Sequence, residues 1–166
     1  MCAEKKYSSL INTESVRPIL NQISIFGGLS KEQLYVILQL LQRITYKAGE
    51  TIFKQGDDPT HIYIVERGEV KIVAEIEAEH VEIIKFGAGQ CFGEMAVIGI
   101  QPHSADAIAV VDTELIVITG ESLLSIYETD KELFGKLILN IAREACRRLH
   151  RTDEVLLHYV HKKSST

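Results

Sequence analysis

The stretch from residue 43 to residue 119 constrains the fold most, because short apolar segments are separated there by turn-forming residues about every ten positions. The segments lie at 44–46, 51–53, 61–65, 70–76, 81–86, 105–111 and 114–119. In the segment 70–76, apolar side chains occupy every second position, as in a strand with one buried face. Glycine-containing turns fall at 47–50, 55–59 and 67–69. This pattern predicts an antiparallel β-roll, a jelly-roll-like double-stranded β-helix.

Residues 13–42 predict an N-terminal helical segment, and the polar residues 1–12 are expected to be disordered. Apolar residues at helical spacing predict a helix over 13–24, which the sequence Phe26-Gly27-Gly28 ends. A second helix follows, since Ser30 and Gln33 have the spacing of a capping box.

Two more helices are predicted after Gly120, so that residues 120–160 are helical. Asp130 has the position of a cap for the longer helix, whose apolar stripe has heptad spacing. The stripe consists of Ile138, Ala142, Ala145, Leu149, Thr152, Leu156 and Tyr159. We expect the first half to pack on the roll and the second half to pair with another copy of the chain. Residues 13–166 then form one α+β, mainly β, domain.

The charge balance of the 166 residues is acidic, with a net charge of −5 and a pI near 5.7. Nucleic-acid binding surfaces are basic, so direct DNA binding is not expected. No apolar run approaches the length of a membrane span or of a signal peptide, which predicts a cytoplasmic protein that does not contact membranes. Cys2, Cys91 and Cys146 lack metal or redox spacing and are expected to be free thiols.

The stretch 86–107, FGAGQCFGEMAVIGIQPHSADA, carries the chemistry. Three glycines allow tight turns, and Gly93-Glu94 precedes an apolar segment with the length of one helical turn. Unpaired amides at a helix start favour an anion. From the local pattern alone, a glycine-rich turn between two strands is the first interpretation.

Neighbouring residues distinguish these alternatives, because 87–105 resembles the phosphate-binding cassette of the cyclic nucleotide-binding domain family. The matching cassette residues are Phe92, Gly93, Glu94, Met95, Ala96, Pro102, Ser104 and Ala105. A second family motif lies at 51–72, and its matching residues are Gly56, Asp57, Tyr63, Ile64, Gly68 and Val70. The resemblance extends over about residues 20–156 and includes both the catabolite activator protein and protein kinase A regulatory subunits.

The resemblance implies a site made of Gly93, Glu94, Met95, Ala96, His103, Ser104, Ala105 and Thr152. Amides around Met95 and Ala96 would bind the phosphate, Ser104 would add a contact, and Glu94 would accept a hydrogen bond from the ribose 2′-hydroxyl. Thr152, on the last helix, would contact the base. The side chains of Phe92 and Met95 are expected in the core.

His103 departs from the family pattern, which has arginine there. Arginine grips phosphate with a permanent charge and two parallel bonds, whereas neutral histidine offers one donor. Leaving a buried phosphate short of its partner costs roughly 2–5 kcal/mol. Either the phosphate induces protonation of His103, or the pocket binds another ligand or none. A surface loop position beside Pro102 is the remaining alternative.

Three functions are weighed. The first is a regulatory module that binds a cyclic nucleotide, cyclic AMP before cyclic GMP, or a related anion, and acts on an effector protein or its own dimer. The second is a degenerate domain that serves as a dimerisation scaffold. The third is a metal-dependent enzyme. The histidines of this sequence lack the His-x-His spacing that such an enzyme needs, so neither catalysis nor a metal cofactor is expected. His158 and His161 have the spacing for a zinc site between chains.

Overall fold

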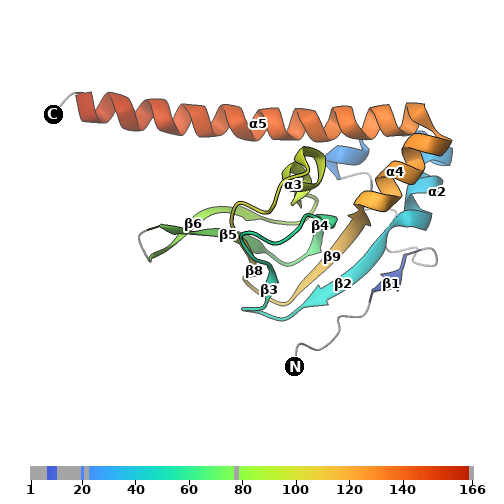
Figure 1. Ribbon diagram of the computed structural model, residues 1–166, viewed down its shortest axis with the longest axis horizontal. Helices are drawn as coiled ribbons and strands as arrows, with labels where there is room; N and C mark the ends of the chain where they lie inside the picture. Colours follow the sequence, from blue (N-terminus) through green and yellow to red (C-terminus); the bar gives the residue numbers. More distant parts are fainter. Residues whose placement is uncertain (1–6, 11–19, 21–22, 77–78, 165–166) are drawn as a thin grey trace.

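The computed structural model describes residues 7–10, 20, 23–76 and 79–164, with side chains outside the described set at 76, 155–156 and 158–164 (Figure 1). The strands are β1 (Ser8–Ser9), β2 (Gln42–Tyr46), β3 (Thr51–Phe53), β4 (His61–Arg67), β5 (Val70–Ile76), β6 (Glu79–Phe86), β7 (Cys91–Phe92), β8 (Asp106–Ala109) and β9 (Thr113–Thr119). The helices are η2 (Ser24–Phe26), α2 (Lys31–Leu40), α3 (Glu94–Gly99), α4 (Gly120–Thr129) and α5 (Lys131–Ser164). The predicted fold class, an antiparallel roll flanked by helices, is confirmed.

Two antiparallel sheets form the roll. One has the order β1-β2-β9-β4-β7, and the other has the order β3-β8-β5-β6. Strands β5 and β6 pair from Val70–Phe86 out to Ile76–Glu79 and form the long hairpin that projects from the roll in Figure 1.

Strands β4 and β9 are buried on both faces. Successive side chains of a strand point to opposite faces, so Ile62 and Ile64 face one way while Tyr63 and Val65 face the other. Tyr63 and Val65 pack inside the roll, in a cluster that includes several aromatic rings. Ile62 and Ile64 join a second cluster, which is shared with the helices. The sequence predicts a strand over 61–65, and the helical layer buries its outer face as well as its inner face.

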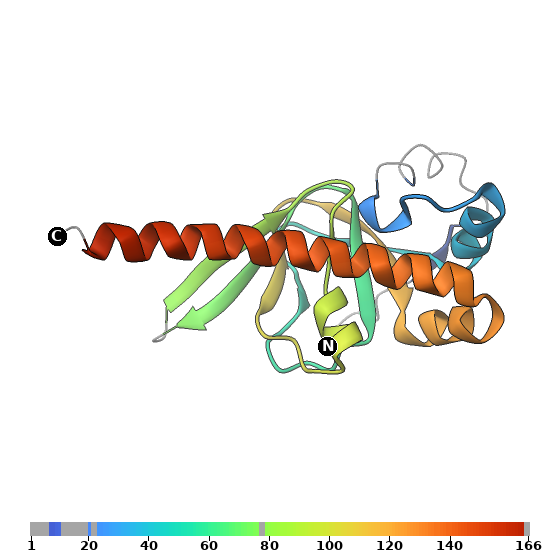
Figure 2. The same cartoon turned by 90° about the horizontal axis from the view of Figure 1, so that it is seen from above.

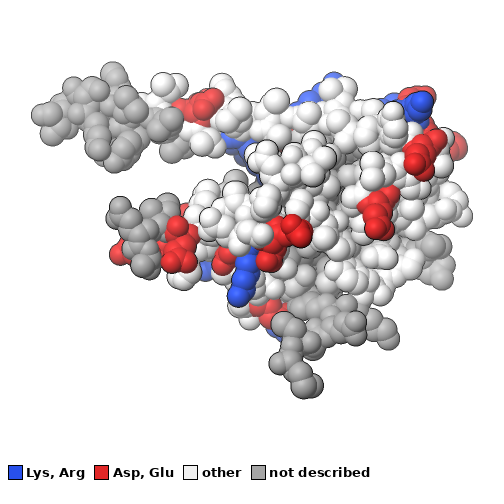
Figure 3. Space-filling view, viewed as in Figure 1, with Lys and Arg blue, Asp and Glu red and all other residues white. Residues whose placement is uncertain are grey.

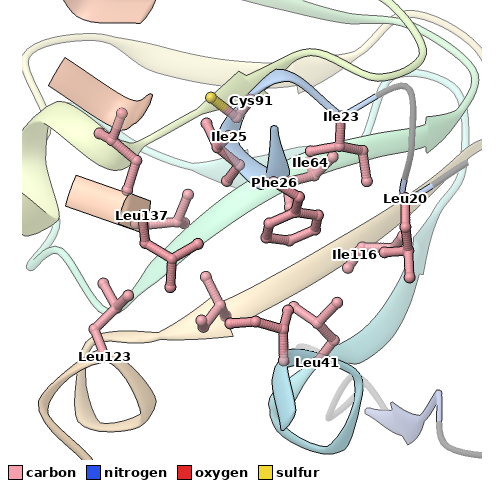
Figure 4. Packing of buried hydrophobic residues seen from close by; sticks show 14 of the residues in the cluster. Leu20, Ile23, Ile25, Phe26, Leu41, Ile64, Cys91, Ile116, Leu123 and Leu137 are labelled. Atoms are coloured by element: carbon pink, nitrogen blue, oxygen red, sulfur yellow. The ribbon is translucent and has the colours of Figure 1, made fainter. Parts of the chain in front are cut away.

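The helical layer covers the outer face of β4 and β9 (Figure 4). Phe26, Leu41, Leu123 and Leu137 come from four separate segments and belong, with Ile116 of β9, to this one cluster. Burying each such side chain stabilises the fold by about 1.5–3 kcal/mol. This second cluster holds the helices against the roll.

The N-terminal segment agrees in part with expectation. The capping box is confirmed, since Ser30 Oγ accepts from Gln33 N and Gln33 Oε1 accepts from Ser30 N. The helix expected over 13–24 falls mostly outside the described residues. Residues 7–10 differ from the expected disorder, because β1 pairs with β2 and Leu10 is buried. Burial of Leu10 explains the difference, and a polar composition does not reveal it.

Helix α5 is 34 residues long, runs across the roll and continues on the side from which the β5–β6 hairpin projects (Figures 1 and 2). Asp130 Oδ1 accepts from Leu133 N, which confirms the expected cap. Leu133, Leu137 and Ile141 are buried, which agrees with packing of the first half. Asn140 donates to two backbone carbonyls of the turn around η2, so this half is also fixed by hydrogen bonds.

Candidate ligand pocket

A cavity of about 590 Å³ lies between the roll, α3 and α5. Its walls are Phe53, Ile72, Ile83, Ile84, Phe86, Phe92, Gly93, Glu94, Met95, Ala96, Gln101, Pro102, His103, Ser104, Ala105, Arg148 and Thr152. All eight residues expected at the site line it. Most of the other walls are apolar or aromatic, a composition typical of small-molecule pockets.

Gly93 and Glu94 set the geometry of α3. Gly93 precedes the helix with φ of 77°, in the left-handed region that favours glycine. A Cβ at this position would lie 3.0 Å from the ring of Tyr63, so the chain also needs the space. Glu94, the first residue of α3, is completely buried. Its carboxylate therefore faces the interior and the cavity, away from bulk solvent.

The core assignment was right for Phe92 and wrong for Met95. Phe92 is buried and stacks against Tyr63 and Phe86. Met95 is 65% exposed, because α3 has only six residues and turns this side chain outward at the rim of the cavity. A one-turn helix has too few residues to bury a complete apolar face.

His103 is a wall residue and not a surface loop residue. It is 5% exposed, and its ring stacks on Phe53 with centroids 3.6 Å apart. Its backbone is fixed by Gly56 N, which donates to His103 O, and by Asp57 O, which accepts from His103 N. Burial lowers the pKa of His103, and the charge of Asp57 opposes this only in part. His103 is therefore neutral near pH 7.

Arg148 is the cavity residue that the sequence analysis missed. It projects from α5 and forms an ion pair with Glu94, while its guanidinium lies 5.4 Å from the centroid of Phe86. Burial lowers the pKa of Arg148, and the charge interaction with the neighbouring Cys91 opposes that shift only in part. Arg148 precedes Thr152 by four residues, so the two share one face of α5. That spacing was the one signal in the sequence.

The remaining expected residues occupy the rim and the floor. Ala105 is buried, and Ser104 is exposed at the edge. Thr152 is exposed, and its hydroxyl donates to the carbonyl of Arg148 within α5. This bond occupies the hydroxyl hydrogen, so Thr152 Oγ1 faces the cavity mainly as an acceptor.

A family model described as the cyclic nucleotide-binding domain matches residues 43–130, more than half of the chain. The chain belongs to the cyclic nucleotide-binding domain family. The matched segment contains the motif at 51–72 and the cassette at 87–105.

Relatives in this family include a receptor protein and a protein kinase. The cyclic AMP receptor protein of Thermus thermophilus is 33% identical over 133 residues, which are 78% of this chain and 58% of that protein. The cGMP-dependent protein kinase egl-4 of Caenorhabditis elegans is 29% identical over 136 residues, which are 81% of this chain and 15% of the kinase. The chain thus spans only part of the length of these relatives.

Solved structures support the same fold. The crystal structure of Thermus thermophilus catabolite activator protein has a TM-score of 0.71 and 31% identity, covering 80% of this chain and 61% of that one. A cyclic nucleotide-binding domain from Methylobacillus flagellatus has a TM-score of 0.80 and 22% identity, covering 93% and 87%. The second comparison concerns the fold alone.

Within residues 7–10, 20, 23–76 and 79–164, no three His, Cys, Asp or Glu side chains are grouped as a metal site would need. His158 and His161 lie in the part of α5 whose side chains are not described. None of the helices that the structure describes has the length and apolar character to cross a membrane. On the face drawn in Figure 3, basic and acidic atoms are interspersed and form no continuous basic surface.

Proposed function

We propose that the chain is a regulatory module that binds a cyclic nucleotide in the cavity and transmits binding through α5. The burial of Glu94 at the wall of a ligand-sized cavity carries this proposal. Glu94 Oε1 is paired with Arg148, whereas Glu94 Oε2 is buried without a partner among the described residues, and a ribose 2′-hydroxyl is a suitable donor to it. Family membership supports the assignment of this acceptor role to Glu94.

The other site residues have the roles that their positions allow. Backbone amides of Met95 and Ala96, together with Ser104, would bind phosphate oxygens at the rim. Gly93 and Ala105 would leave room for the sugar phosphate, and Thr152 would contact the base. His103 would bind the phosphate as a cation after taking up a proton. Cyclic AMP is preferred over cyclic GMP in this proposal, in line with the cyclic AMP receptor protein among the relatives.

Coupling to α5 would be a population shift between two helix positions, driven by ligand contacts that one position alone makes. The module would bind ligand without transforming it, and its output would pass to an effector protein. Leu149 and Leu157 are 62% and 69% exposed on the second half of α5, which supports homodimerisation through this helix. A cytoplasmic setting is consistent with the free thiols of Cys91 and Cys146.

Calorimetric titration with cyclic AMP and cyclic GMP, at about pH 7 and pH 5.5, tests the ligand assignment. Saturable heat with cyclic AMP at millimolar concentration or below is expected, with tighter binding at the lower pH. Absence of binding at both pH values would reject the sensor function. Light scattering with gel filtration measures the dimer separately.

A degenerate domain that serves as a scaffold is the second candidate, and the neutral His103 favours it. Burial of this ring against Phe53 leaves the cavity without the cation of the family cassette. A His103→Arg variant separates the two candidates. If only the arginine is missing, the variant gains cyclic nucleotide binding, whereas a scaffold pocket that is closed in other ways does not.

A further inference from the structure

The charges around the cavity do not balance for a phosphate ligand bound in the family manner. Among the described residues of the wall, Glu94 is the acid and Arg148 is the one permanently charged cation. His103 is neutral near pH 7, since burial lowers its pKa. A phosphodiester would therefore enter a wall with no cation from the cassette itself.

The ion pair between Glu94 and Arg148 leaves a hydrogen-bonding atom unused on each partner. Arg148 Nη2 donates to Glu94 Oε1, but Arg148 Nε and Glu94 Oε2 are buried without a partner among the described residues. The side chain of Glu94 is 1% exposed and that of Arg148 is 17% exposed. Buried polar atoms without partners are rare in native proteins, and a bound ligand or water can supply the partner.

A ligand that supplies both partners has a definable chemistry. Arg148 Nε needs an acceptor and Glu94 Oε2 needs a donor, so the complement is a ligand that carries an anionic oxygen beside a hydroxyl. A cyclic nucleotide has both, in its phosphate and its 2′-hydroxyl. The contacts of Arg148 with Cys91 and Phe86 hold the guanidinium at the wall, so that it is oriented before a ligand enters.

We propose that Arg148 supplies the positive charge for the ligand phosphate in this chain, in the role that the absent cassette arginine has elsewhere. This inference rests on the proposed function. Because Arg148 is part of α5, the phosphate is bound directly by the helix that transmits the signal. Binding of the phosphate is then thermodynamically coupled to the position of the helix.

The test compares cyclic AMP with adenosine, which keeps the base and the 2′-hydroxyl but lacks the phosphate. The ratio of the adenosine Kd to the cyclic AMP Kd, measured by calorimetry on the full chain, reports the contribution of the phosphate. Arg148→Met is expected to lower this ratio by about tenfold or more. Arg147→Met is the matched control, because Arg147 is on the same helix, 57% exposed and paired with Glu144.

Removal of Arg148 leaves Glu94 as an unpaired buried charge, which endangers folding. The same comparison is therefore made in a Glu94→Gln background, where Arg148→Met leaves no buried carboxylate unpaired. The ratio is again expected to fall when Arg148→Met is added, and His103→Arg is expected to restore it. Thermal unfolding of each variant identifies those that are folded.

The inference is overturned if Arg148→Met changes the ratio of the adenosine Kd to the cyclic AMP Kd by less than about threefold relative to the protein without this substitution. It is also overturned if the ratio falls and His103→Arg does not raise it again. Failure of the proposed function has a different result: no ligand binds to the parent chain or to the His103→Arg variant. If cyclic AMP binds only after His103→Arg, the family function survives and the role of Arg148 is rejected.

Discussion

Substitution of arginine for His103 is the most informative perturbation of the pocket. In the wild-type cavity Arg148 is the one permanent cation among the described wall residues and is shared with Glu94, so a bound phosphate is only partly compensated while His103 is neutral. An arginine at 103 restores the balance with a permanent cation. The stack of His103 on Phe53 is lost in both the free and the bound protein, so it affects stability and cancels from the affinity.

The magnitude follows from these charges. Truncating one partner of a buried charge pair costs roughly 2–5 kcal/mol, and the lower value corresponds to about thirtyfold in affinity. We therefore expect His103→Arg to tighten cyclic AMP binding by about thirtyfold or more at neutral pH. Loss of the aromatic stack lowers the free energy of unfolding by about 1 kcal/mol.

The pH dependence of binding provides a second measurement on the same variant. Burial holds the pKa of His103 below its ordinary value in the free protein, and a bound phosphate raises it. Proton uptake on binding then makes the wild-type affinity increase as pH falls, by at most about tenfold per pH unit for one proton. Arginine does not titrate in this range, so the contribution of residue 103 to the slope disappears in the variant.

Calorimetry with cyclic AMP at about pH 7 and pH 5.5 measures both effects. Glu94 faces the same cavity and is present in both proteins, so the difference between them isolates residue 103. His80→Arg is the control, because His80 is exposed on β6, outside the cavity, and the charge change is the same. A folded His103→Arg variant whose affinity rises less than about threefold would refute the charge argument.

Three further predictions concern stability. Asn140→Ala leaves two backbone carbonyls without their donor and should lower the free energy of unfolding by about 2–3 kcal/mol, measured by urea titration; a loss below about 0.5 kcal/mol would contradict it. Gly68→Ala should lower the free energy of unfolding by about 3 kcal/mol or more, since φ is 98° and a Cβ would lie 2.5 Å from a side-chain oxygen at the start of β9. Gly28→Ala, also at positive φ but in open space, should lower it by only about 1 kcal/mol. Burial lowers the pKa values of His61 and His103, so the unfolded state binds more protons and the free energy of unfolding should fall as pH drops below about 6.5. A His61→Gln/His103→Gln variant should show a flatter dependence of this free energy on pH, and an unchanged slope would exclude this cause.

Short-range patterns in the sequence were sufficient for much of the fold. The capping box at Ser30, the cap at Asp130 and the turn-separated strands depend on residues within a few positions of one another. Strands β1 and β7 were missed, because two-residue strands have no period and exist only through their partners. The order of the strands in the sheets is likewise a long-range property.

The sequence by itself determined the class of the domain, the place of the cassette and the absence of its arginine, because each depends on residue type and local spacing. Only the tertiary structure decided that Met95 faces outward, that the ring of His103 is buried on Phe53 and that Arg148 is paired with Glu94. Arg148 and Glu94 are 54 residues apart in the chain. Their contact depends on how α5 crosses the roll, and this crossing is set by the packing of the complete helical layer.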